Sequence, residues 1–222
     1  MKYLLDDDIY EETKEIALGK IEKNPVLAEL SEWFLSTYSV PVLNFQFGKP
    51  ERSKIKGYRL YVILETTEDF NKMFHSPLQL NEEYAAQICA EFKRIALQHQ
   101  FATKAQLRGM WVRYNDFSVE ARTDTNSRVI KEAKTRILKI HPEVWSVVGD
   151  GFAGAVVFYY TDENVLDNQN SGVSKTIIEN YYSLLKKYDE LNVFTRENMN
   201  LKFDSKENLD RNYEGNLYYY FH

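Results

Sequence analysis

The chain has 222 residues and a formal net charge of −5, from 28 Lys and Arg against 33 Asp and Glu. Its hydrophobic fraction of 44% and charged fraction of 27% are ordinary for a folded globular protein, which argues against disorder over most of the chain. Both halves are slightly acidic. This argues against broad nucleic-acid binding, which needs a concentrated positive surface.

The sequence also bears on the cellular compartment. No uninterrupted apolar run approaches the roughly 20 residues that a membrane helix needs. The first residues, MKYLLDDDIYEE, turn acidic before an apolar segment of signal-peptide length can form. A single cysteine permits no internal disulfide. We therefore expect a cytoplasmic protein without membrane contact.

In the first half, the acidic residues Asp6 to Asp8 precede a helix-like stretch that ends near Lys20, and Asn24-Pro25 is typical of a second helix start. Asn115-Asp116 between MWVRY and FSVEA indicates a hairpin turn. The expected elements of this half are strands over Val42 to Phe47 and Leu60 to Leu64 and a helix over Glu82 to Gln100. A last pair of strands opens with Met110 to Tyr114.

The second half repeats this order. Asn126 or Ser127 is expected to cap a linker helix, and His141-Pro142 to end it. A turn-rich stretch, DSKENLDRNYEGN, leads into a last strand over residues 217–221. The other expected elements are strands over Val144 to Val148, Ala155 to Tyr160 and Met199 to Phe203, with a helix over Lys175 to Leu191.

The two halves therefore follow one pattern, with corresponding elements about 90–100 residues apart. The sequence predicts an α+β fold of two tandem α-β-β-α-β-β repeats, residues 1–125 and 126–222. Each repeat is expected to form an antiparallel sheet of about four strands with helices packed on one face.

Two glycine- and aspartate-containing segments match ligand motifs only superficially. GDGFAG (residues 149–154) fits the dinucleotide template G-x-G-x-x-G, but a strand-like AVVFYY follows where the template needs a helix, so a hairpin turn is the better interpretation. DNQNSG (residues 167–172) resembles the start of a calcium loop, but Ile178 occupies the position of the required bidentate Glu. We interpret it as a polar loop.

Catalytic and metal-binding signals are weak. The histidines are His75, His99, His141 and His222, and no two have the spacing of zinc ligands on one element. Cys89 lies beside the apolar stripe of a helix, where a buried thiol is the expected state. The sequence contains no Walker loop and no G-x-S-x-G elbow. We therefore expect no catalytic residue, no metal and no cofactor.

Tyrosine is abundant, with 16 residues. If residues 217–221 form a strand, Leu217 and Tyr219 share one face and Tyr218 and Tyr220 the other, so both faces are apolar or aromatic. A strand solvated on one face would be more polar, so the outer face is expected to pack on something. Tyr218 and Tyr220 are the expected partner contacts, while Trp145 is expected in the core.

The second half is similar to the YezG-like family of bacterial toxin-immunity proteins. The similarity lies in HPEVW (141–145), an aromatic hairpin that ends in VVFYYTDE (156–163), a long helix, and MNLKFDSKENLDRNYEGNLYYYF (199–221). In the first half, Pro41-Val42-Leu43 stands in place of the Pro-Glu-x-Trp stretch. The resemblance implies a non-enzymatic cytoplasmic protein that binds and neutralises a toxin domain, and it implies no catalytic residue.

The resulting hypothesis is a protein-binding module, with an immunity-type inhibitor of a toxin as its specific candidate and a homo-oligomer left open. Two alternatives stay open. One is a metal-free enzyme or small-ligand binder with its site between the two repeats. The other is a self-assembling structural protein whose aromatic face joins copies of the chain.

Overall fold

The computed structural model describes residues 5–49, 57–76 and 79–222 and divides the chain into two compact units, Met1–Glu120 and Ala121–His222. We call these unit 1 and unit 2. The division falls inside a helix, α6 (Phe117–Ile140), whose first turn belongs to unit 1. The boundary expected from the sequence, between residues 125 and 126, lies slightly later in the same helix.

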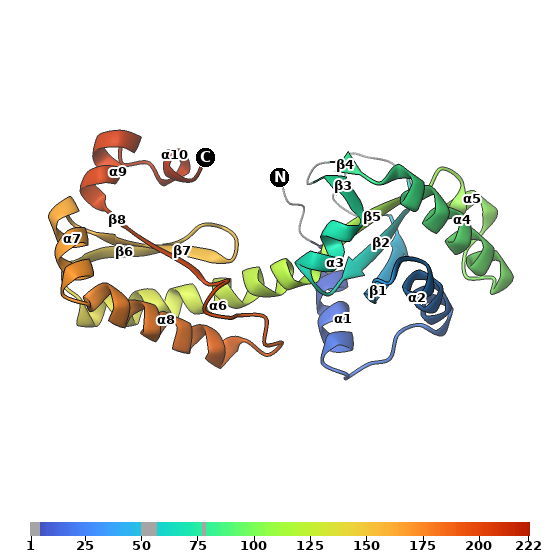
Figure 1. Cartoon of the computed structure of the whole chain (residues 1–222), viewed down its shortest axis with the longest axis horizontal. Helices are drawn as coiled ribbons and strands as arrows, with labels where there is room; N and C mark the ends of the chain where they lie inside the picture. Colours follow the sequence, from blue (N-terminus) through green and yellow to red (C-terminus); the bar gives the residue numbers. More distant parts are fainter. Residues whose placement is uncertain (1–4, 50–56, 77–78) are drawn as a thin grey trace. The chain divides into compact units, whose positions relative to one another are not determined.

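Unit 1 is built on a three-stranded sheet of order β1-β2-β5, with a separate short ribbon formed by β3 and β4 (Figure 1). Its elements before α6 are α1 Asp7–Ala17, α2 Pro25–Tyr38, β1 Val42–Gly48, β2 Arg59–Leu64, α3 Thr67–Lys72, β3 Phe74–Ser76, β4 Gln79–Leu80, α4 Glu82–Gln98, α5 Lys104–Leu107 and β5 Trp111–Asp116.

Unit 2 has a three-stranded sheet of order β6-β7-β8. Its elements after α6 are β6 Val144–Gly149, β7 Gly154–Tyr159, α7 Asp162–Asn170, α8 Val173–Tyr188, β8 Asn200–Ser205, α9 Lys206–Tyr213 and α10 Leu217–Phe221. The two units therefore share one order of elements around the sheet: helix, two strands, a short helix, a long helix, a strand and a helix.

The strand pairing is also the same in both units. The first two strands are antiparallel, β1 with β2 and β6 with β7, as a short connection allows. The third strand is parallel to the second, β5 to β2 and β8 to β7, after a connection that contains the long helix α4 or α8. Each sheet is thus mixed and three-stranded.

The expectation of four-stranded antiparallel sheets was therefore wrong in two respects, although the α+β class is correct. The third strand is parallel, and the segments expected as fourth strands are helical. The Asn115-Asp116 pair is no hairpin turn, because the Asp116 carboxylate accepts the Val119 N–H at 3.2 Å and so begins α6. Likewise the Asn216 side chain accepts the Tyr218 N–H at 2.8 Å and begins α10.

Burial accounts for the positions of the long helices. In unit 1, Phe34 of α2 and Ile88 and Phe92 of α4 are fully buried against Phe45 and Val62 of the sheet. The apolar stripe expected for residues 82–100 is thus confirmed as α4. In unit 2, residues of α6 and α8 form the corresponding core with one face of β7: Val129, Ala133, Ile137, Val157, Tyr159, Ile177, Tyr181 and Leu185.

The sheet of unit 2 carries helices on both faces, not on one as expected. Along β7, Val157 and Tyr159 point to α6 and α8, and Val156 and Phe158 point to the opposite face. On that second face Leu209 of α9 is buried, and residues of α10 pack beside it. The outer face of this sheet is therefore covered by the chain's own last two helices.

Among the described residues, no helix is both long and apolar enough to span a bilayer.

One buried group in the core of unit 1 leads to a stability prediction. Tyr114 is 7% exposed, and its hydroxyl has no hydrogen-bond partner among the described residues. A buried hydroxyl without a partner destabilises the folded state, so Tyr114→Phe should raise the free energy of unfolding of unit 1 by about 1 kcal/mol. Hydrogen exchange of the β5 amides measures this.

The matched control for Tyr114 is Tyr159 of unit 2. Its buried hydroxyl lies 2.9 Å from Ser174 Oγ. Tyr159→Phe removes the same atom but leaves a buried hydroxyl unpaired, so it should destabilise unit 2. Equal effects of the two substitutions would contradict the assignment of Tyr114 as unpartnered.

Candidate functional site

The strongest candidate site in unit 2 lies where the two parallel strands end. Because β7 and β8 are parallel, Tyr159 and Ser205 are register partners at the same edge of the sheet. A helix starts directly after each strand. Thr161 caps α7 by accepting the Asn164 N–H at 3.1 Å, and Ser205 caps α9 by accepting the Asn208 N–H at 2.8 Å. Carboxyl ends of parallel strands are common ligand sites in α/β sheets.

A hydrogen bond joins the two helix starts at this edge. The Ser205 hydroxyl donates to Asp162, the first residue of α7. Unit 1 contains the same bond with donor and acceptor exchanged. There the hydroxyl of Thr67, the first residue of α3, donates to Asp116 Oδ2 at 2.5 Å, and Asp116 caps α6. The repeated architecture therefore extends to one specific polar contact, which sequence identity does not reveal.

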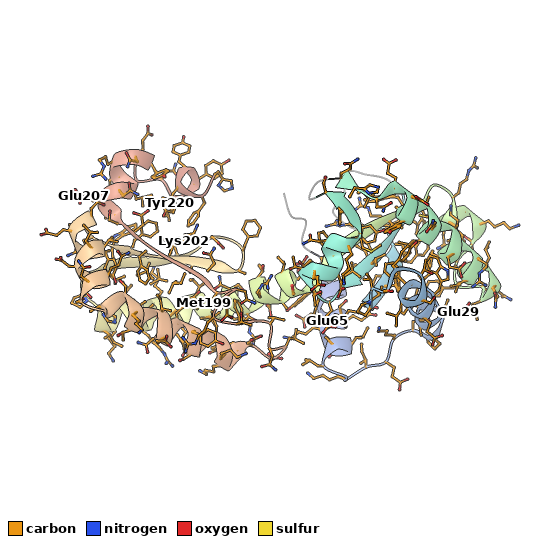
Figure 2. The ribbon with its side chains drawn as sticks, viewed as in Figure 1. Glu29, Glu65, Met199, Lys202, Glu207 and Tyr220 are labelled. Atoms are coloured by element: carbon orange, nitrogen blue, oxygen red, sulfur yellow. The ribbon has the colours of Figure 1, made fainter. Side chains whose placement is uncertain are left out.

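In unit 2 this edge opens into a shallow groove with a volume of about 700 Å³. Figure 2 labels Glu207 in the first turn of α9, which borders it. The lining residues are Tyr160, Thr161, Lys206, Glu207, Asp210 and Arg211.

The charged groups of the groove satisfy one another. Arg211 Nη2 lies 2.9 Å from Asp162 Oδ2, and Lys206 pairs with Asp210. The Glu207 carboxylate accepts the Asp162 N–H at 3.0 Å and so lies at the N-terminal end of α7. The hydrogen bonds from Ser205 and Arg211 lower the pKa of Asp162. These two bonds therefore favour the ionised form of the Asp162 carboxylate.

A short turn after α9, the helix α10 presents two exposed tyrosines, which we call the tyrosine pair: Tyr218, 64% exposed, and Tyr219, 54% exposed. Their ring centroids are 6.0 Å apart, and the Tyr218 ring stacks on His222 at 4.4 Å. The tyrosine pair thus forms an aromatic surface on one side of α10, and the other side of this helix packs on the sheet.

Tyr220 anchors that helix. Its ring packs against Phe158 at 5.1 Å and Tyr213 at 5.0 Å, and its hydroxyl donates to Asp204 Oδ2 at 2.7 Å. Burial and the hydrogen bond to Asp204 raise its pKa. Figure 2 labels this half-buried residue on α10. The sequence placed Tyr218 and Tyr220 on one face of a strand. In a helix, residues two apart do not share a face, so the structure separates them.

Two further sequence candidates, Cys89 and His99, belong to unit 1. Cys89 contacts the Met110 carbonyl at 3.9 Å, and burial raises the pKa of its thiol, which disfavours the nucleophilic thiolate. His99 lies 2.8 Å from Glu29 at the end of α4. Among the described residues, no three His, Cys, Asp or Glu side chains are grouped to hold a metal ion.

The two motif-like segments have structural roles. In the 149–154 segment, Asp150 Oδ1 accepts the Phe152 and Gly154 N–H groups at 2.8 and 3.1 Å, which closes the hairpin predicted between β6 and β7. The 167–172 segment is not the expected loop, because it forms the end of α7 and the turn before α8.

Asn126 is a structural residue that sequence reasoning misassigned as a helix cap. It lies inside α6, is 2% exposed, and donates to the Gly154 carbonyl at 2.9 Å and the Phe152 carbonyl at 3.2 Å. Its Oδ1 accepts the Tyr181 hydroxyl at 2.5 Å. It therefore joins α6, α8 and the β6–β7 hairpin. The only sequence signal is a polar residue within a mostly apolar helical face.

No protein-family model, curated protein or solved structure gives a significant match to this chain.

Proposed function

We propose that this protein is a non-enzymatic protein-binding module and that the tyrosine pair on α10 is its principal contact surface. The supporting observation is the exposure of Tyr218 and Tyr219 on a helix held in place by buried contacts of Tyr220. Tyrosine offers a large contact area with few rotatable bonds and a polar tip, which suits protein interfaces.

The partner we propose is another protein. The resemblance of residues 130–221 to YezG-like immunity proteins makes a toxin domain the first candidate to test.

The proposal predicts that Tyr218→Ala combined with Tyr219→Ala weakens partner binding by about 10- to 30-fold, because aromatic interface anchors often contribute most of the affinity. The chain is used as bait in a lysate pull-down, the retained protein is purified, and its affinity is measured by calorimetry. Because both side chains are more than half exposed, the circular dichroism and melting temperature of the double variant should match the parent.

Two further variants sharpen this test. Leu166→Ala on α7 removes another exposed apolar side chain, 61% exposed, and should leave affinity unchanged. Tyr220→Phe removes the bond to Asp204 and should weaken binding only slightly, through looser positioning of α10. Unchanged affinity of the double variant would contradict the proposal. Light scattering tests the alternative of a self-assembling protein, because an oligomer joined through the tyrosine pair would dissociate in the double variant.

A further inference from the structure

A second concave feature of unit 2 lies between α6 and α8, away from the tyrosine pair. It has a volume of about 260 Å³, close to nine times the liquid volume of a water molecule. Its apolar lining includes Ile137, Tyr181 and Leu184, which are 4%, 1% and 5% exposed and belong to the core. The pocket is therefore a depression in the surface of the core, with room for roughly ten non-hydrogen atoms.

The mouth of this pocket exposes an apolar side chain. Ile140, in the last turn of α6, lines the pocket and is 63% exposed. Leaving an isoleucine of a folded helix largely in water forgoes the stabilisation that burial would give. A ligand with an apolar body would cover Ile140 and fill the space above Leu184 at once.

The polar lining carries uneven charge. Arg136 of α6 and Lys187 of α8 both line the pocket, and both pair with one carboxylate, Glu132, with Lys187 Nζ at 3.6 Å from Glu132 Oε1. Glu132 also accepts the Tyr188 hydroxyl at 2.6 Å. The two cations thus share a single carboxylate, which also accepts a hydrogen bond from Tyr188. This part of the pocket rim would therefore attract an additional anion.

His141 also lines the pocket. Its Nδ1 lies 3.3 Å from Glu143 Oε1, and its buried Nε2 has no hydrogen-bond partner among the described residues. Because this nitrogen is closed off from solvent, His141 borders the pocket without offering a polar atom to a ligand, and the two cations Lys187 and Arg136 are the groups that an anion can reach.

From these features we infer that the pocket between α6 and α8 binds a small amphipathic anion. This ligand is a monocarboxylate with an apolar body, and the whole molecule has about ten non-hydrogen atoms. The apolar body packs on Ile137, Leu184 and Ile140, and the carboxylate lies near Lys187 and Arg136. This inference is independent of the protein-binding surface on α10.

The test is an NMR titration of the full-length chain with octanoate, with octan-1-ol as the uncharged control. We expect saturable shifts confined to amides around Ile137, Ile140 and Leu184, with a dissociation constant on the order of 10⁻⁴ M for a ligand of this size. Octan-1-ol should bind about tenfold more weakly, because it lacks the charge that Lys187 and Arg136 attract. Shifts scattered over the surface, or equal binding of the alcohol, would overturn the inference.

Matched variants locate the site. Ser183 is exposed and lines the pocket, so Ser183→Trp should fill it and abolish the shifts, whereas Ser127→Trp, exposed elsewhere on unit 2, should not. Lys187→Met should weaken octanoate about tenfold without changing octan-1-ol. Lys175→Met on the same helix, away from the pocket, should change neither. Octanoate binding that survives Ser183→Trp would place it outside this pocket.

Discussion

Replacing Asn126 with alanine should lower the free energy of unfolding of unit 2 by about 3–5 kcal/mol, the largest effect that we expect for a single polar side chain in this protein. The substitution leaves the buried Tyr181 hydroxyl unpaired and removes one hydrogen bond each from the carbonyls of Phe152 and Gly154, of which the second keeps the Asp150 N–H at 3.0 Å. A buried hydroxyl without a partner costs about 1–3 kcal/mol, and each lost hydrogen bond adds about 0.5–1.5 kcal/mol. Native-state hydrogen exchange of the β7 amides gives the change in unfolding free energy.

Two companion variants separate the parts of this contact. Ser127→Ala, at the neighbouring exposed position, should change the stability of unit 2 by less than about 0.5 kcal/mol. Tyr181→Phe should cost less than Asn126→Ala, because it removes one of the three hydrogen bonds. Once Asn126 is alanine, removing the Tyr181 hydroxyl should cost little or even restore stability, a coupling that a double-mutant cycle measures. Additive effects would show that the two side chains do not depend on each other.

Asn126 also illustrates the limit of prediction from this sequence. Strand and helix positions followed from local patterns: the apolar stripe around Ile88 and Phe92 located α4, and the apolar runs located β2 and β7. The partners of Asn126 lie 26 to 55 residues away in sequence, and no local pattern specifies them. The helix-cap interpretation was reasonable for an Asn–Ser pair but ignored the tertiary contact.

The direction of the third strand was equally hidden. A buried strand such as β7 has the same apolar composition beside a parallel or an antiparallel neighbour, so the hydrophobic pattern alone cannot distinguish them. The caps contained the better signal. Asp116 and Ser205 are the last residues of β5 and β8, and each precedes a helix with an acidic residue in its first turn, Glu120 and Glu207 respectively. Interpreting Asp116 as a helix start would have removed the expected fourth strand of unit 1, and the N-cap Asn216 contains the corresponding signal for α10 in unit 2.

For the candidate site, composition identified the tyrosine-rich end but not its geometry. The sequence grouped Tyr218 with Tyr220, and the helix groups Tyr218 with Tyr219 as exposed residues while Tyr220 packs on Phe158. The groove depends on the meeting of α7 and α9 at the ends of the parallel strands β7 and β8. It could not be foreseen while β8 was expected to be antiparallel.

The second large effect concerns Glu120 of unit 1, a residue with no sequence signal. The residue is 9% exposed, and burial raises the pKa of its carboxyl group from an ordinary 4.5 to about 7, although the Leu5 N–H at 3.1 Å and Asn115 favour the ionised form. Between pH 4.5 and pH 7 the folded state therefore binds more protons than the unfolded state. By linkage, the stability of unit 1 falls as the pH rises through this window, and above pH 7 the whole penalty is present.

Glu120→Gln should remove this dependence. A neutral amide still accepts the Leu5 N–H but carries no buried charge, so at pH 8 the variant should be more stable than the parent by about 2–3 kcal/mol, and at pH 4.5 nearly equal to it. Urea unfolding is followed in a Trp145→Phe background, where the remaining tryptophans, Trp33 and Trp111, both report on unit 1. Exposed Glu11→Gln should leave the pH slope intact. A parent whose unit 1 gains stability from pH 5 to pH 8 would contradict the raised pKa, because the sign of the slope depends on the folded state holding that proton.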